Sequence, residues 1–330
     1  MKRPTLVVAA LLVAACLVAT GGRATGKRQL RVGFVVLAGV VPTTRTLDGQ
    51  AFAGFLRAQK RLGISGRVVY VGPNEDPVRV FTGLARQDYD LIISAIPFEE
   101  PPEAAARQFP GVRFLTTDAP GKNPQRRKNL ERTVYRAEQA GYLAGYLAAL
   151  MEKQTSGKHE ISAVGGIPFP GVTRWIVGYR AGATRADPGV VVRVDYSQNF
   201  SNPAKCARVA RNQIATGSGA VFNVSGVCGL GALSAARAKG VWGIGVDVDQ
   251  SFLGNHILTS AIIRTDKGVF EMIRRLVHGT FKTGGAAVFD LRGGYVGLGR
   301  INKSVPRAFV RRLNRIHAQI VAGQIKVPRA

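Results

Sequence analysis

Short apolar runs alternate with amphipathic segments along this chain. Residues 30–37 (LRVGFVVL) form the first apolar run, and residues 48–61 follow with Phe52, Phe55 and Leu56 at helical spacing. The same alternation continues to residue 117 and resumes between residues 160 and 263. Because strands that alternate with helices form parallel sheets, the pattern predicts an α/β fold.

The expected elements form two series of similar size. Strands are expected at residues 30–37, 67–71, 89–96, 112–117, 160–164, 190–196, 220–224, 241–246 and 257–263. Helices are expected at 48–61, 77–86, 103–108, 138–153, from 173 onward, and at 203–214, 230–239, 266–278 and 306–322. Residues 119–132 suggest a crossing or surface loop, and residues 287–291 and 295–298 suggest a hairpin or two crossing strands.

Two such series predict two doubly wound lobes with a cleft between them, and clefts between lobes are preferred ligand sites. We expect the first lobe to comprise residues 30–132 with 257–284. The second lobe is expected to comprise residues 133–256 with 285–325.

The first residues have the pattern of an export signal. Lys2 and Arg3 precede an apolar run over residues 6–19, which is too short to span a bilayer comfortably. Residues 1–24 are therefore expected to be a signal peptide. Residues 13–16 (VAAC) fit a lipobox with Cys16 as the lipidated residue, and ordinary cleavage after Gly21 or Ala24 is the alternative. Either route predicts an exported protein, periplasmic or lipid-anchored at the cell membrane.

The chain is strongly basic, with 46 Lys and Arg against 20 Asp and Glu, a formal charge of +26. Such a charge can indicate a nucleic-acid partner. Here the basic residues are scattered and the chain is expected to be exported, so no nucleic-acid role is predicted. The densest clusters are residues 122–132 and a helix face with Arg307, Arg311, Arg312 and Arg315. We interpret them as solvated surface, with attraction to an anionic surface as the alternative.

Two cysteines follow the signal segment. Cys206 lies in the first turn of an expected helix, and Cys228 lies in the loop that leaves the next strand. Both therefore belong to one pole of the second lobe. An oxidising compartment permits a disulfide between them.

Residues 220–250 are organised as strand, glycine loop, helix and strand, ending near Asp247. Gly226, Gly229 and Gly231 allow close backbone approach. Ligands of open α/β sheets bind outside the carboxyl ends of the strands. The two loops of this stretch therefore suggest one binding site, although ordinary glycine-rich turns without a ligand fit the same pattern.

Residues typical of catalysis are not arranged for it. His159, His256, His278 and His317 lie far from one another and from the cysteines in the sequence. The glycine loop and Asp247 resemble a dinucleotide-binding fingerprint, but Ser234 replaces its third glycine. We therefore expect no enzyme activity, no metal and no cofactor.

Several segments, in order, resemble the basic membrane protein family. They are LDGQAFAGF, FPGVRFLTTD, AGYLAGYLAALM, VGGIPFPGVTRWIVGYRAG, GIGVDVDQS and LTSAI. Members of that family are exported, often lipidated binding proteins of ABC importers, and the characterised branch binds purine nucleosides. The resemblance implies a type I periplasmic binding protein, with two α/β lobes joined by three crossovers. It also implies a monomer that captures a small molecule and delivers it to ABC permease subunits. A ligand-sensing ectodomain without transport is the alternative.

The resemblance also implies a binding site. Phe52 and Trp175 match aromatic residues that stack on a base, and Asp118 matches the carboxylate that recognises it. The positions expected to complete the site are Asp48, Phe98, Gly226, Gly229 and Asp247. From the residues alone, a core position is the less favoured alternative for Phe52 and Trp175, and capping of a turn is the alternative for Asp118.

The sequence departs from the family mainly on the sugar side of the expected site. Thr43 and Thr44 stand where the family has acidic residues, Asp48 replaces an asparagine, and Ile263 replaces a lysine. Burying a hydroxyl without a partner costs about 1–3 kcal/mol. We therefore expect free purine bases to bind at least as tightly as their ribonucleosides.

Overall fold

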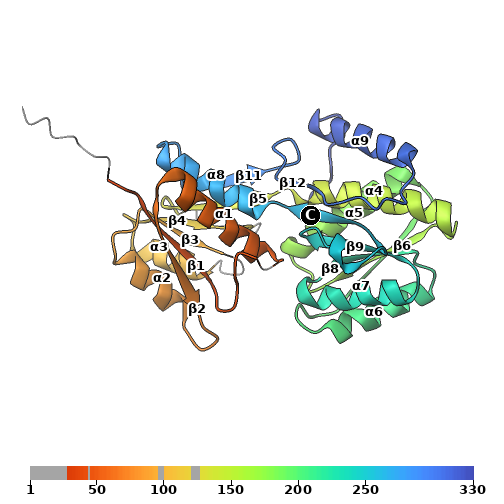
Figure 1. Cartoon of the computed structure of the whole chain (residues 1–330), viewed down its shortest axis with the longest axis horizontal. Coiled ribbons are helices and arrows are strands. Elements are labelled where there is room, and N and C mark those ends of the chain that lie inside the picture. Colours follow the sequence, from red (N-terminus) through yellow and green to blue (C-terminus); the bar gives the residue numbers. More distant parts are fainter. Residues whose placement is uncertain (1–27, 44, 96–99, 120–126) are drawn as a thin grey trace, which may run out of the picture.

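The structure, a computed structural model, describes residues 28–43, 45–95, 100–119 and 127–330. In these residues, two six-stranded sheets form two lobes side by side along the long axis of the molecule (Figure 1). The expected signal peptide and Cys16 lie outside the described residues.

The first sheet has the strand order β11-β5-β4-β3-β1-β2, and all its neighbouring strands pair in parallel. Its strands are β1 (Arg31–Leu37), β2 (Ser65–Val71), β3 (Leu91–Ser94), β4 (Arg113–Thr116), β5 (Leu130–Tyr135) and β11 (Ala286–Phe289).

The second sheet has the order β12-β10-β9-β8-β6-β7, parallel except for the antiparallel edge strand β12. Its strands are β6 (Glu160–Gly165), β7 (Val191–Tyr196), β8 (Ala220–Val224), β9 (Trp242–Asp247), β10 (Ile257–Ile263) and β12 (Val296–Leu298).

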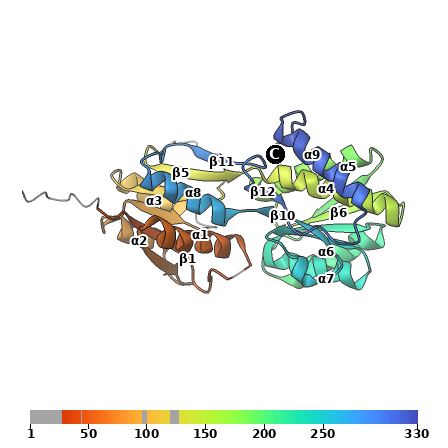
Figure 2. The ribbon, with the colours of Figure 1, turned by 45° about the horizontal axis from the view of Figure 1, so that its top comes forward.

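Pairs of helices cover the sheets on both faces. The helices are α1 (Leu47–Leu62), α2 (Pro77–Ala85), α3 (Glu100–Gln108), α4 (Ala137–Thr155), α5 (Pro170–Ala186), α6 (Pro203–Ala215), α7 (Gly229–Ala238), α8 (Thr265–Val277) and α9 (Arg307–Val321). On the first sheet, α1 packs with α8 and α2 packs with α3. On the second sheet, α4 packs with α5 and α6 packs with α7, while α9 lies on α4 (Figure 2). None of the helices described here is long and apolar enough to cross a bilayer.

Strands covered on both faces should be buried along their whole length and mostly apolar. Every residue of β3, β6 and β8 is buried. The edge strands β2 and β7 instead keep exposed residues along their length. This difference explains why the inner strands gave the clearest apolar runs in the sequence.

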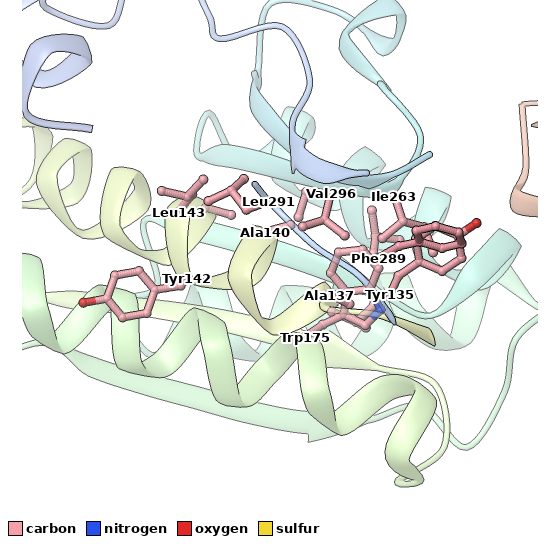
Figure 3. Packing of buried hydrophobic residues seen from close by; sticks show 14 of the residues in the cluster. Tyr135, Ala137, Ala140, Tyr142, Leu143, Trp175, Ile263, Phe289, Leu291 and Val296 are labelled. Atoms are coloured by element: carbon pink, nitrogen blue, oxygen red, sulfur yellow. The ribbon is translucent and has the colours of Figure 1, made fainter. Parts of the chain in front are cut away.

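The chain passes between the lobes three times, which confirms the expected fold class. It crosses from β5 to α4, from β10 to α8, and from β11 to β12. Residues at these strand ends pack into one core. Tyr135, Ile263, Phe289 and Val296 lie together there (Figure 3), and the rings of Tyr135 and Phe289 have centroids 5.3 Å apart.

The expected lobe boundaries were wrong at two strands. Strand β10 was assigned to the first lobe, but it pairs with β9 in the second sheet. Strand β11 was assigned to the second lobe, but it pairs with β5 in the first sheet. Strand β5 itself begins inside residues 119–132, which were expected to be a loop. Local pattern identifies a strand, but the partner of that strand is a distant segment.

Cys206 and Cys228 form a disulfide in the structure, as the sequence suggested. The helix face that carries Arg307, Arg311, Arg312 and Arg315 is exposed, which agrees with a solvated surface.

Helices α4 and α5 approach each other so closely that glycines are required where they cross. A Cβ on Gly141 or Gly145 of α4 would collide with a carbonyl oxygen of α5. A Cβ on Gly178 or Gly182 of α5 would collide with a carbonyl oxygen of α4. On each helix the two glycines are four residues apart, so they share one face.

We predict that Gly145→Ala destabilises the protein by about 1–3 kcal/mol, because its Cβ would press on the Tyr179 carbonyl oxygen. Gly83→Ala on α2 is the matched control, since a Cβ there meets nothing within 4 Å. Alanine should stabilise α2 by about 0.5–1 kcal/mol. Urea unfolding of both variants tests this. Equal free energies of unfolding for the two variants would mean that α4 and α5 can move apart enough to accept the added methyl group.

Candidate ligand-binding site between the lobes

Three carboxylates meet where the lobes face each other. Asp48 lies in the first turn of α1, and Asp118 follows β4 in the first lobe. Asp247 is the last residue of β9 in the second lobe. All three lie beyond the carboxyl ends of parallel strands, where ligands of such sheets bind.

The backbone positions two of these residues in an unusual conformation. Asp118 has φ +47° and Asp247 has φ +68°, both in the left-handed region. The amide of Asp118 donates a 2.9 Å hydrogen bond to Oγ1 of Thr133, which holds that turn against β5. Thr46 caps α1, because its side chain accepts from the amide of Gly49 at 3.2 Å. The Asp48 carboxylate is therefore not needed for capping.

Two carboxylate oxygens lack a partner in the described part of the chain. Oδ1 of Asp48 and Oδ1 of Asp118 are both buried without a hydrogen bond. Buried polar groups are nearly always satisfied, so an unpaired acceptor needs an explanation. Two such acceptors at the interlobe contact are what a ligand with N–H or O–H donors would satisfy.

Burial and neighbouring charges raise the pKa of two of the three acids. Burial raises the pKa of Asp48 to about 7, and the charge of Asp247 adds to the rise. Burial likewise raises the pKa of Asp247 to about 7, where the charge of Asp118 adds to the rise and Arg174 opposes it. Both carboxyl groups are therefore expected to change protonation near neutral pH.

Contacts between the lobes hold the site closed. The guanidinium of Arg174 on α5 donates to Oδ2 of Asp118 at 2.6 Å. Nε2 of Gln50 on α1 donates to the carbonyl oxygens of Asp247 at 3.4 Å and Ile263 at 3.3 Å. Arg45 lies 3.9 Å over the ring of Phe252. Each of these contacts joins a residue of the first lobe to a residue of the second lobe.

The expected stacking residues lie in the core. Phe52 is 5 % exposed and stacks on Phe34 with ring centroids 5.5 Å apart. Trp175 is 2 % exposed and lies beside Ala137 and Tyr135 (Figure 3). Neither ring presents a free face in this closed arrangement. Helical periodicity could not distinguish a core stripe from a cleft wall.

Two glycines and one phenylalanine complete the expected set. Gly226 is exposed with φ +58°, so its amide region is accessible. The amide of Gly229 already bonds the Gly226 carbonyl, and a Cβ on Gly229 would collide with Asn223. Packing therefore explains Gly229 without a ligand. Phe98 lies outside the described residues.

The sequence interpretation missed Arg174, Gln50 and an exposed aromatic pair. Phe169 and Phe200 follow β6 and β7 and are 44 % and 37 % exposed. Their rings meet edge to face at 6.1 Å. Exposed phenylalanines in loops beyond two strand ends are the signal that could have identified them, but exposure is not visible in a sequence.

Two surface hollows lie away from the three carboxylates. One, of about 450 Å³, lies along α5 and β7. The other, of about 390 Å³, lies beside Arg136, Asp290 and the C-terminal segment. Because neither is lined by Asp48, Asp118 or Asp247, we place the candidate site at the interlobe acids. There three carboxylates lie together, and Arg174 and Gln50 make hydrogen bonds from one lobe to the other.

The acid pair predicts a pH-dependent stability of the ligand-free protein. A carboxyl whose pKa is raised on folding retains a proton that the unfolded chain releases. Stability should therefore fall as the pH rises from about 4 to about 7, and then level off. Asp48→Asn removes one ionising group. It should stabilise the protein at pH 8 by about 1–2 kcal/mol, allowing for partial solvent screening, and have little effect at pH 4.

Thermal unfolding at both pH values tests this prediction. Asp88→Asn is the control, because Asp88 is exposed and asparagine also tolerates its positive φ. A gain for Asp48→Asn that is the same at pH 4 and pH 8 would exclude ionisation as its cause.

Comparison with known proteins identifies the family. A family model described as ABC transporter substrate-binding protein PnrA-like matches residues 48–330. The ABC transporter nucleoside-binding protein BmpA of Lactococcus lactis is 27 % identical over 267 residues, which cover 75 % of this chain and 74 % of that protein. Basic membrane protein B of Borrelia garinii is 34 % identical over 181 residues, which cover 53 % of this chain and 52 % of that protein.

A solved structure shares the fold. The crystal structure of an ABC transporter solute-binding protein from Aeropyrum pernix K1 aligns with a TM-score of 0.76 at 22 % identity. The alignment covers 91 % of this chain and 94 % of that one. Since the family model covers most of the chain and the fold agrees, this protein belongs to the basic membrane protein family of ABC transporter substrate-binding proteins.

Proposed function

We propose that this chain is the exported, ligand-capturing subunit of an ABC importer. In this proposal it binds a purine nucleoside, purine base or related flat heterocycle between its lobes and presents the closed form to the permease. The membership of the family supports the coarser part of this proposal. The observation that carries the finer part is the meeting of Asp48, Asp118 and Asp247, with two buried acceptors unpaired.

The acids suit a neutral ligand rich in hydrogen-bond donors. A carboxylate accepts from ring N–H groups and from hydroxyls, and such charge-assisted bonds are stronger than neutral ones. Asp118 has one oxygen bound to Arg174 and one oxygen free, so it can accept from the edge of a base. The exposed pair Phe169 and Phe200 supplies aromatic surface on which a base could stack once the lobes open.

The structure adds an argument about the sugar. From the sequence we expected fewer ribose contacts, because Ile263 and Thr43 replace polar partners. Asp48 and Asp247, however, come from opposite lobes, and the charge of Asp247 contributes to the raised pKa of Asp48. Two adjacent acceptors match the two neighbouring hydroxyls of a ribose. We therefore propose ribonucleosides as better ligands than free bases, against the expectation from sequence.

Calorimetric titration of inosine and hypoxanthine compares nucleoside with base. Inosine should bind at least about tenfold tighter, a difference of about 1.4 kcal/mol. Asp48→Asn should lower the affinity for inosine and leave the affinity for hypoxanthine unchanged. Asp88→Asn should change neither affinity. Hypoxanthine binding as tightly as inosine would restore the expectation from sequence. No binding of either, or of their adenine and guanine counterparts, would exclude the purine proposal.

Asp118→Asn should lower the affinity for the purine by roughly 10- to 150-fold, because a charge-assisted hydrogen bond of about 1.5–3 kcal/mol is lost. Asparagine is preferable to alanine because it tolerates the positive φ of this residue. Unchanged affinity in the same titration would mean that Asp118 is structural only.

A further inference from the structure

One buried arginine links the two lobes at the candidate site. Arg174 lies in the second turn of α5 in the second lobe, and its side chain is only 8 % exposed. Its Nη2 donates to Oδ2 of Asp118 in the first lobe at 2.6 Å, and its Nη1 donates to the carbonyl oxygen of Tyr135 at 3.1 Å. Tyr135 is the last residue of β5, directly before the chain crosses to α4. Arg174 thus contacts the opposite lobe and a crossover at once.

The ion pair with Arg174 engages only one of the two carboxylate oxygens of Asp118. The Asp118 side chain is 6 % exposed, and Oδ2 is taken by Arg174 while Oδ1 has no partner among the described residues. A lone carboxylate buried to this extent would be costly, and pairing with a guanidinium offsets part of that cost. Arg174 therefore supports the buried Asp118 side chain and leaves one of its oxygens available.

This arrangement also affects the equilibrium between open and closed lobes. When the lobes separate, Arg174 and Asp118 must part, since they belong to different lobes. The other polar contacts across the site are weaker, because the hydrogen bonds of Gln50 are 3.3–3.4 Å long. The Arg174–Asp118 pair is thus the strongest described polar contact that joins the two lobes at this site.

We propose that Arg174 is a positioning residue with two roles. It latches the lobes together while the cleft is empty, and it holds Asp118 so that Oδ1 faces the ligand. The second role rests on the proposed function, whereas the first role does not. A ligand then enters during opening and replaces no part of the latch, because it takes the oxygen that Arg174 leaves free.

The latch is tested on the ligand-free protein by small-angle X-ray scattering. Arg174→Met should raise the radius of gyration relative to the native protein, because the lobes separate. Arg185→Met, an exposed arginine on the same helix, should leave it unchanged. Asp118→Asn removes the partner's charge with little change in shape and should open the lobes to a similar extent. It also keeps the test decisive if Arg174→Met does not fold.

The double variant Arg174→Met with Asp118→Asn identifies the ion pair as the cause. If the two residues act as a pair, the radius of gyration of the double variant should equal that of either single variant. It should not show the sum of the two increases. Radii of gyration equal to that of the native protein in both single variants would overturn the latch. Additive effects would overturn the pairing as its basis.

Inosine titration then tests the second role. Arg174→Met should bind inosine at least about tenfold more weakly, as expected when one member of a buried charge pair is removed. Arg174→Lys should recover part of the loss, because lysine keeps the charge. Native affinity in Arg174→Met would overturn the positioning role. Failure of the native protein to bind any purine would instead overturn the proposed function. The scattering experiment would still test whether the Arg174–Asp118 ion pair holds the lobes together.

Discussion

The crossing of α4 and α5 at backbone contact determines where the interlobe ion pair can form. Four glycines bring the carbonyl oxygens of each helix against the Cα atoms of the other. Such contacts also permit weak Cα–H···O attraction. Gly141 meets the carbonyl oxygen of Trp175, the residue directly after Arg174. Helix α4 begins two residues after β5, so the crossing places Arg174 against the first crossover and within reach of Asp118.

The second constraint is the small number of acidic residues. The chain has 20 Asp and Glu residues against 46 Lys and Arg residues, so carboxylates are scarce and too few to pair one to one with the basic side chains. Several of these acids join separate elements. Asp266 on α8 binds Arg57 on α1, and Glu160 on β6 binds Arg193 on β7. Against that background, three carboxylates that crowd one interlobe contact with a single arginine are a costly arrangement. Burial raises the pKa of Asp48 and Asp247 to about 7, and the charge of a neighbouring aspartate adds to each rise.

Sequence reasoning predicted parts of the candidate site and missed others for identifiable reasons. Asp247 was predicted because it ends an apolar run, and the carboxyl end of a parallel strand is where polar residues meet a ligand. Asp118 was predicted only from the resemblance to the family. Phe52 and Trp175 fitted both a core stripe and a cleft wall, and the structure places both in the core. Arg174 carried no local signal, since one arginine among 46 basic residues is unremarkable until its partner is known. Phe169 and Phe200 could be recognised only from their exposure.

The sequence by itself determined the α/β class, the order of most elements, and the two lobes. These follow from periodicity and from local turn and cap residues, which act over a few positions. It also placed Cys206 and Cys228 at one pole, where they form a disulfide. Only the tertiary structure decided that β10 belongs to the second sheet and β11 to the first, and that Arg174 pairs with Asp118. Strand pairing and ion pairs between lobes join residues that are far apart in the chain, and no local pattern records which distant segment will lie beside another.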